Sequence, residues 1–173
     1  MRSDINKISL SRKLRWIIPW AVLILALDLG TKQLALRELE LLEVRPVTSF
    51  FNLVLVENQG AAFSLLSGRG SYQGLKMALL ASLALAPLLY FLLDARRPSS
   101  FFALGLILGG ALGNIHDRLR YNAVVDFLDF HFQGHHWPAF NLADAAIVVG
   151  VGILLWVSLR EGRPKKTIVA KRG

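Results

Sequence analysis

Two aspartates stand in apolar surroundings at separate places in the chain. Asp126 lies between Val125 and Phe127, and Asp144 ends the run that begins at Phe140. Two carboxyl groups in one low-dielectric site do not both ionise, so that one pKa rises and one proton is shared. The ionised member can take a proton from water while the protonated member donates to a peptide carbonyl. If the two converge, the pair predicts aspartic-protease chemistry with water as the nucleophile.

Each aspartate also has a simpler interpretation when it is taken alone. Asp126 can be an ordinary acid of a loop, and Asp144 can be an anion favoured by the dipole at the start of its helix. Other catalytic groups are scarce. The chain has no cysteine, which excludes Cys nucleophiles and thiolate metal sites. Ser64 and Ser67 have no evident base beside them in the sequence.

Three histidines form the only histidine cluster. His131 and His135 have a spacing that can bind a metal, and His136 is adjacent. Gly134 lies between them and argues against a helix. We therefore interpret the three as loop residues at an aqueous interface, and we expect neither a metal nor a cofactor.

The elements that must position these groups are membrane spans. The 173 residues are 54% hydrophobic and only 18% charged, with a mean hydropathy of +0.46, which excludes a disordered chain and disfavours a water-soluble globule. Four apolar stretches are each near the ~20 residues that a helix needs to cross a bilayer. We predict one integral membrane domain over 1–173, an all-α membrane protein with spans at about 16–36, 73–93, 98–117 and 140–160 and outer loops at about 37–72 and 118–139.

A small extracytoplasmic β-structure is predicted in the first outer loop. Residues 50–56 are rich in strand formers, residues 58–60 suit a turn, and residues 61–66 suit a return strand. The first span is not interpreted as a cleaved signal peptide. Its leading segment is long, and Asp28 and Lys32 stand where small residues and a cleavage site are expected.

The basic residues predict the orientation of the spans. The net charge is +8, and thirteen Lys and Arg residues lie before the first span, between the second and third, or after the fourth, against five in the two long loops. Both termini are therefore expected in the cytoplasm and both long loops outside. This pattern explains the positive charge without nucleic acid, since the basic residues flank spans instead of lining one face.

Charged and amide side chains inside the spans are functional candidates because lipid does not tolerate them without a partner. Asp28 and Lys32 are four residues apart and can pair on one helix face; a structural pair and a chemical role both remain open. Asn114 and Asp117 share a face at the end of the third span, after the small-residue run 109–113. Arg118 follows, so that Asp117 and Arg118 can instead be an ordinary surface pair.

Five short motifs occur in order along this frame. They are Asp28–Lys32 (DLGTK), Asn58–Ser64 (NQGAAFS), Gly113–Arg118 (GNIHDR), Val124–Phe127 (VVDF) and Phe140–Asp144 (FNLAD). Together they resemble the bacterial lipoprotein signal peptidases, also called signal peptidase II, over most of the chain. The family pattern often has a glycine four residues before the aspartate of the fourth motif. Asn122 stands there in this chain, and Asn is among the few residues that tolerate the left-handed conformation.

The resemblance implies an enzyme of the bacterial inner membrane that removes the signal peptide from diacylglyceryl-modified prolipoproteins, cutting before the lipidated cysteine. It implies partners among membrane lipids and globomycin-type inhibitors, and no metal, cofactor or nucleic acid. Asp126 and Asp144 fall on the catalytic dyad at the outer leaflet. The other motif positions are implied to shape the site or hold the substrate; these are Asn58, Gly60, Asn114, Asp117, Arg118, Asn141 and Ala143.

Two other classes of protein remain as alternatives. A transporter or proton relay also uses intramembrane carboxylates, but four spans are few, no inverted repeat is visible, and the acids gather at one boundary instead of the midplane. A membrane-anchored interaction module would use the same polar residues only for helix packing. Replacing Asp126 or Asp144 by Asn separates the three, through loss of turnover, loss of proton-coupled flux or loss of stability alone.

Overall fold

The computed structural model describes residues 8–59 and 95–161, together with the single helical positions 75, 79, 88, 91 and 92. Most of the predicted second span at 73–93, the predicted return strand at 61–66 and Gly60 lie outside the described residues. Three helices in the described part of the chain are long and apolar enough to cross a membrane. They are α1 (Leu10–Glu38), α4 (Pro98–Tyr121) and α5 (Leu142–Glu161), and they correspond to three of the four predicted spans.

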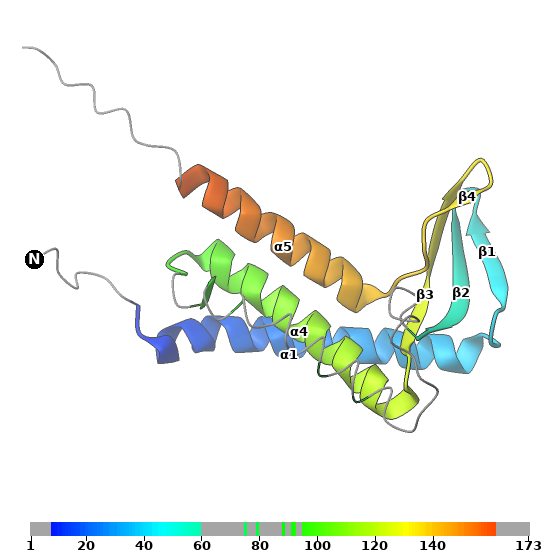
Figure 1. The fold of residues 1–173 in the computed structure, drawn as a ribbon, viewed down its shortest axis with the longest axis horizontal. Helices are drawn as coiled ribbons and strands as arrows, with labels where there is room; N and C mark the ends of the chain where they lie inside the picture. Colours follow the sequence, from blue (N-terminus) through cyan, green and yellow to red (C-terminus); the bar gives the residue numbers. More distant parts are fainter. Residues whose placement is uncertain are drawn as a thin grey trace, which may run out of the picture.

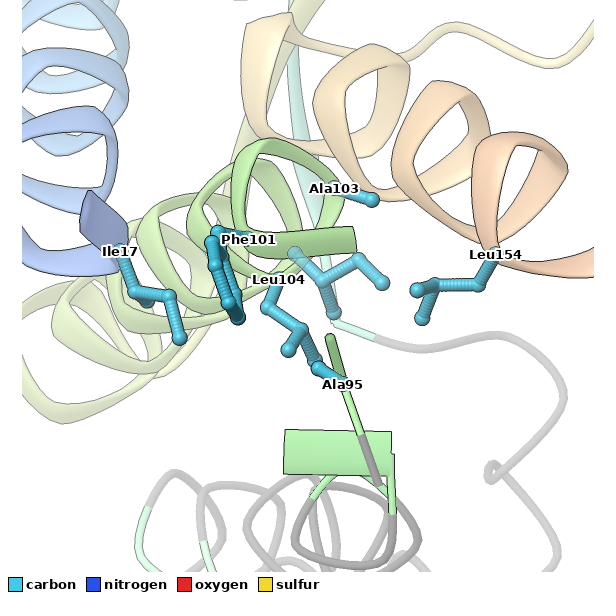
Figure 2. Close-up of a cluster of buried hydrophobic side chains, with 7 residues drawn as sticks. Ile17, Ala95, Phe101, Ala103, Leu104 and Leu154 are labelled. Carbon is cyan, nitrogen blue, oxygen red and sulfur yellow. The ribbon is translucent and has the colours of Figure 1, made fainter. Parts of the chain in front are cut away.

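Helix α4 is the centre of the described helices and packs against both α1 and α5. In its most apolar stretch 67% of the residues are buried, compared with 17% in α1 and 22% in α5. Helices α1 and α5 instead expose large apolar side chains such as Trp16 and Leu155, as expected of helices that face lipid. Figure 2 shows Ile17 of α1 and Leu154 of α5 approaching the side chains of α4 in one buried cluster.

Glycines allow the three helices to approach closely. A Cβ at Gly109 would lie 2.5 Å from the backbone oxygen of Ala21 on α1, and a Cβ at Gly110 would lie 2.5 Å from that of Ala143 on α5. Adjacent glycines on α4 thus bring the backbones of two different helices into contact, as small residues commonly do between membrane helices. Since Ala143 precedes Asp144, the contact at Gly110 also sets the distance of Asp144 from α4.

We expect Gly110→Ala to destabilise the protein and lower its activity. The new methyl group would overlap a backbone oxygen, so that α5 must move, at a cost of roughly 1–3 kcal/mol for overpacking. The matched control is Gly152→Ala on α5, where a Cβ would meet no atom within 4 Å. Thermal unfolding in detergent measures both variants. A Gly110→Ala protein as stable as the Gly152→Ala protein would contradict the close approach.

A four-stranded antiparallel sheet lies at one end of the helices. Its strands are β1 (Val44–Thr48), β2 (Phe51–Asn58), β3 (Val124–Phe132) and β4 (His135–His136), in the order β1-β2-β3-β4. The β-structure predicted in the first outer loop is thus present, but the prediction that the protein is all-α apart from that loop is wrong. Half of the strands come from the segment predicted as the second outer loop, where the run from Val124 to Phe132 is rich in β-branched and aromatic residues.

The sheet is joined to the bundle at the ends that the three helices share. Figure 1 shows it alongside the last turns of α1, next to the C-terminal end of α4 and the N-terminal end of α5. One buried cluster makes the junction, with Ala35 and Leu39 of α1 packed against Leu55, Val125 and Phe127 of the sheet. An isolated two-stranded ribbon is marginally stable in water. The two additional strands and this buried cluster therefore account for the stability of the sheet.

The turn from α4 into β3 requires an unusual backbone conformation. Asn122 caps the C-terminus of α4 with φ 56° and ψ 14°, in the left-handed region. Asn adopts this region more readily than most residues, which confirms the prediction that the turn survives without the glycine of the family pattern. The chain then reaches Asp126 only four residues later, so this cap determines where the strand and its carboxylate begin.

Candidate active site

Asp126 lies near the start of β3 and is 1% exposed. It pairs across the sheet with Val56 of β2, after a bulge between Leu53 and Val56. Because residues two apart on a strand share one face, Asn58 lies on the same face as Val56 and reaches Asp126. Its Nδ2 donates to Asp126 Oδ2 at 2.9 Å. Bulges bend and twist a strand and are common beside functional sites.

Asp144 lies in the first turn of α5 and is partly buried. Asn141, directly before the helix, caps it: the Oδ1 of Asn141 accepts the backbone N–H of Asp144 at 2.9 Å. Asn is among the preferred residues for this position. The interpretation of Asp144 as an acid at a helix N-terminus is therefore correct as to its place, and it does not exclude a second role for the carboxylate.

Two asparagine amides connect the two aspartates. Asn141 Nδ2 donates to Asp126 Oδ1 at 2.8 Å, and Asn114 Nδ2 donates to Asp144 Oδ1 at 2.8 Å. The two amides also contact each other, through Asn141 Nδ2 and Asn114 Oδ1 at 3.2 Å. Each carboxylate thus receives an N–H donor from a shared pair of amides. The sequence predicted that these segments converge, and the geometry brings them together.

A cluster of buried charges lies next to the two asparagine amides and contacts Asn114. Lys32 Nζ lies 2.8 Å from both Asp28 Oδ2 and Asp117 Oδ2. It also donates to Asn114 Oδ1 at 3.0 Å. Lys32 is 2% exposed, Asp28 0% and Asp117 1%. The predicted pair of Asp28 and Lys32 is confirmed, while the alternative of a surface pair between Asp117 and Arg118 is wrong, since Asp117 is buried against Lys32.

The carboxylates of this cluster also bind the backbone beside the two candidate aspartates. Asp28 Oδ1 accepts the N–H of Ala143 at 2.9 Å, and Asp117 Oδ2 accepts the N–H of Val125 at 3.2 Å. Ala143 directly precedes Asp144, and Val125 directly precedes Asp126. Each buried acid therefore anchors the residue before one member of the pair, and a predicted site position, Ala143, contributes through its N–H. Gly113 was not predicted as a site residue, but the Asp28 carboxylate needs a glycine there, because a Cβ at this position would overlap it.

Arg118 adds a cation at the edge of the site. Its Nη1 donates to the backbone oxygen of Asn114 at 3.1 Å, and its charge interacts most strongly with Asp144 among the carboxylates, then with Asp117 and Asp126. The positive charge of Arg118 therefore acts more on Asp144, which is partly buried, than on Asp126, which is fully buried.

Burial sets the protonation of Asp126. Removal from water and the negative charge of Asp144 together raise the pKa of Asp126 to about 6, although the hydrogen bonds from Asn58 and Asn141 and the charge of Lys32 oppose them. A buried carboxyl group next to a second carboxylate is the arrangement in which one proton is shared. The environment thus favours a pair that holds one proton in the weakly acidic range.

The histidines lie elsewhere, at the far end of the sheet. His131 and His136 stand opposite each other on β3 and β4, so their interpretation as loop residues is wrong. His136 Nδ1 lies 2.9 Å from Asp129, which also accepts from Asn52 Nδ2 at 2.7 Å. Burial alone would raise the pKa of Asp129, but these contacts outweigh it and lower that pKa. Within the described residues, no group of three or more His, Cys, Asp or Glu side chains is arranged to hold a metal ion.

Of the predicted site residues, those within the described chain converge on one place, and Gly60 lies outside it. The convergent set is Asp28, Lys32, Asn58, Asn114, Asp117, Arg118, Asp126, Asn141, Ala143 and Asp144.

Comparison with known proteins identifies the family. Residues 20–160 match the family model described as signal peptidase (SPase) II. The chain is 47% identical over 156 residues to a lipoprotein signal peptidase of Azoarcus sp. (strain BH72), covering 86% of this chain and 87% of the relative. It is also 47% identical over 150 residues to one of Francisella tularensis subsp. mediasiatica (strain FSC147), covering 85% of this chain and 92% of the relative.

Solved structures agree with the sequence comparison. A bacterial membrane enzyme determined by the in meso method superposes with a TM-score of 0.72 at 28% identity, covering 93% of this chain and 100% of that one. A second such structure gives 0.73 at 27% identity, covering 95% and 98%. From the family match over most of its length, we conclude that this chain belongs to the signal peptidase II family and is an aspartic peptidase.

Proposed function

We propose that this protein removes the signal peptide from diacylglyceryl-modified prolipoproteins and that Asp126 and Asp144 are its catalytic dyad. The observation that carries the proposal is the pair of amides, Asn114 and Asn141, that joins the two carboxylates at one end of the helices. The similarity to the lipoprotein signal peptidases of Azoarcus and Francisella supports the substrate class.

The reaction needs one proton on the dyad. The ionised carboxylate takes a proton from water as the water oxygen attacks the carbonyl carbon, and the protonated carboxyl group donates to the carbonyl oxygen. Collapse of this tetrahedral gem-diol breaks the C–N bond: the leaving amine takes a proton from the dyad, and one hydroxyl of the gem-diol gives its proton back to the dyad as the C=O bond re-forms. The dyad returns to its singly protonated state, and no metal or covalent intermediate takes part. Asn58, Asn114 and Asn141 orient the carboxylates, while Arg118 and Ala143 shape the site around them.

We further propose the membrane arrangement that this reaction requires. Four spans, including one at about 73–93, form one domain over residues 1–173 in the bacterial inner membrane, with both termini in the cytoplasm. The distribution of basic residues supports this orientation. It puts the sheet and the dyad at the outer leaflet, where the diacylglyceryl chains can remain in the bilayer while the peptide bond reaches the aspartates. Gly60, on a family motif, belongs to the substrate-binding part of this proposal.

Cleavage by the purified protein tests the proposal. The probe is a prolipoprotein carrying the diacylglyceryl group, compared with the same precursor without it, in detergent with a chelator and with or without globomycin. We expect cleavage of the lipidated precursor alone, before the modified cysteine, and inhibition by globomycin. A folded protein that is inert toward the lipidated precursor would contradict the proposal, and proton flux in proteoliposomes would then favour the relay.

The pH dependence of cleavage provides a separate prediction. Because burial raises the pKa of Asp126 to about 6, the dyad loses its proton as the pH rises through this value, and kcat/KM should fall on the alkaline side. Asn58 donates to Asp126 and favours its ionised form, so Asn58→Leu should move this alkaline limb to higher pH. Initial rates across a pH series measure both. An alkaline limb that Asn58→Leu leaves in place would contradict the assignment to Asp126.

A further inference from the structure

The Asn114 amide lies between a hydrogen-bond donor, Lys32, and a hydrogen-bond acceptor, Asp144. On one side Lys32 Nζ lies 3.0 Å from its Oδ1, and on the other Asp144 Oδ1 lies 2.8 Å from its Nδ2. A lysine ammonium group only donates hydrogen bonds. The amide oxygen must therefore face Lys32, and the amide nitrogen must face Asp144.

The corresponding amide on the other side of the site is fixed differently. Asn141 Oδ1 accepts the backbone N–H of Asp144 at 2.9 Å, so its Nδ2 points to Asp126. A backbone N–H is always present, whereas in the described part of the chain Asn114 Oδ1 accepts only from side chains, Lys32 Nζ at 3.0 Å and Asn141 Nδ2 at 3.2 Å. Of these two donors, Lys32 makes the shorter contact and carries a charge. Among the described residues, Lys32 contacts Asp28, Asp117 and Asn114. Its contact with Asp144 is therefore made through the Asn114 amide, while its charge also acts on Asp126 through space.

We propose that Lys32 is a positioning residue for peptide cleavage: it fixes the Asn114 amide as a donor to Asp144, so that Asp144 is the ionised base and Asp126 carries the shared proton. The inference rests on the proposed dyad and assigns the two roles within it.

The charges around the dyad agree with this assignment. From α1 the dyad faces Lys32 and Asp28, and from α4 it faces Asp117 and Arg118; β2 contributes the neutral Asn58. The charge of Arg118 acts most strongly on Asp144. Asp144 is also partly exposed, whereas Asp126 is 1% exposed. The negative charge is better hydrated and better paired at Asp144, and the proton belongs at the buried site.

A charge-free triple variant, Asp28→Asn with Lys32→Met and Asp117→Asn, separates this role from simple electrostatics. It removes all three buried charges, which sum to a net charge of −1, while keeping acceptor oxygens for the backbone N–H groups. Loss of a net negative charge alone would favour ionisation of the dyad and move the acidic limb of the kcat/KM profile to lower pH. Loss of the oriented donor acts in the opposite direction, because the freed amide can turn its oxygen toward Asp144.

We expect the acidic limb of the triple variant to rise by about one pH unit, which is a tenfold change in proton affinity. Asn114→Leu should raise the limb similarly, and combining it with the triple variant should add nothing further, because both act through one amide. Lys32→Arg keeps a donor-only cation and should keep the wild-type limb. The matched control is Lys13→Met, which removes another buried lysine of α1, whose Nζ donates to the oxygen of Leu92 at 2.8 Å.

A folded triple variant whose acidic limb stays in place or falls, or shifts that add in the combined variant, would overturn the positioning role. Infrared difference spectra give a second readout. The band of a protonated carboxyl group in the wild type should disappear in Asp126→Asn and persist in Asp144→Asn. Failure of the proposed function has a different signature, since cleavage would then be absent in the wild type or would survive both single Asp→Asn changes.

Discussion

Asp144→Asn is expected to abolish cleavage of the lipidated precursor while the protein stays folded. The change removes the carboxylate that we propose as the base that takes a proton from water, and general acid–base catalysis contributes on the order of 10²–10⁴-fold to a rate. The geometry should survive, because the side-chain oxygen of the substituted residue can still accept the hydrogen bond that Asn114 now donates at 2.8 Å. Single-turnover cleavage and thermal unfolding of the same preparation measure the two effects together.

Asp126→Asn should cause a comparable loss of rate with a larger structural disturbance. Asp126 accepts hydrogen bonds on both oxygens, from Asn58 and from Asn141, so the nitrogen of an Asn would face one of these donors. The matched control is Asp129→Asn, on the same strand and also buried, whose carboxylate binds Asn52 and His136 instead. It should keep near wild-type turnover. Turnover at the wild-type rate in either dyad variant would contradict the catalytic assignment.

The sequence predicted which residues meet at this site better than it predicted the architecture around them. Asp28 and Lys32 were visible as a pair because both lie on one helix, where a spacing of four residues means one face. The convergence of Asp126 with Asp144 could be predicted because ionisable groups in apolar surroundings need polar partners, and such groups gather at one site. The partners of Asp117 were not visible, since Lys32 lies on another helix and only packing brings the two within 2.8 Å.

The segment predicted as the second outer loop, at about 118–139, shows why the extent of the sheet was underestimated. Strands β3 and β4 have their partners about 70 residues away in β2, or across a two-residue turn that contains Gly134. Such pairing leaves no regular period in the local sequence, and β3 is buried along most of its length instead of alternating. The sequence prediction placed Asp126 in a loop at about 118–139, and therefore did not assign its neighbours to a strand. Propensity alone would have identified Val124 to Phe132 as a strand.

The asparagines illustrate a further limit of sequence reasoning. Asn114 and Asn141 were predicted as site residues from the family motifs, but an amide gives no indication of which way its oxygen faces. Asn141 is oriented by the first turn of its own helix, a local relation that capping preferences anticipate. Asn114 is oriented by a lysine 82 residues earlier and by the amide of Asn141, and only the three-dimensional structure supplies these contacts.

Lys32→Met is expected to destabilise the protein more than any other single change considered above outside the dyad. It leaves Asp28 and Asp117, which are 0% and 1% exposed, as two buried carboxylates without their cation. Removing one partner of a buried ion pair typically costs about 3–5 kcal/mol, because the remaining charge is neither hydrated nor paired. We expect loss of most folded protein in detergent, measured by thermal unfolding and by the yield of monodisperse protein.

The same reasoning predicts that stability returns when the two carboxylates are neutralised as well. Replacing a complete buried ion cluster by neutral groups of similar shape is often neutral or stabilising, so the Asp28→Asn, Lys32→Met, Asp117→Asn protein should unfold close to the wild-type temperature. Lys13→Met offers the comparison, since Lys13 is 5% exposed but binds a carbonyl oxygen of Leu92, and its loss leaves no carboxylate of this cluster without its cation. A single Lys32→Met protein as stable as Lys13→Met would show that the three charges are not mutually dependent.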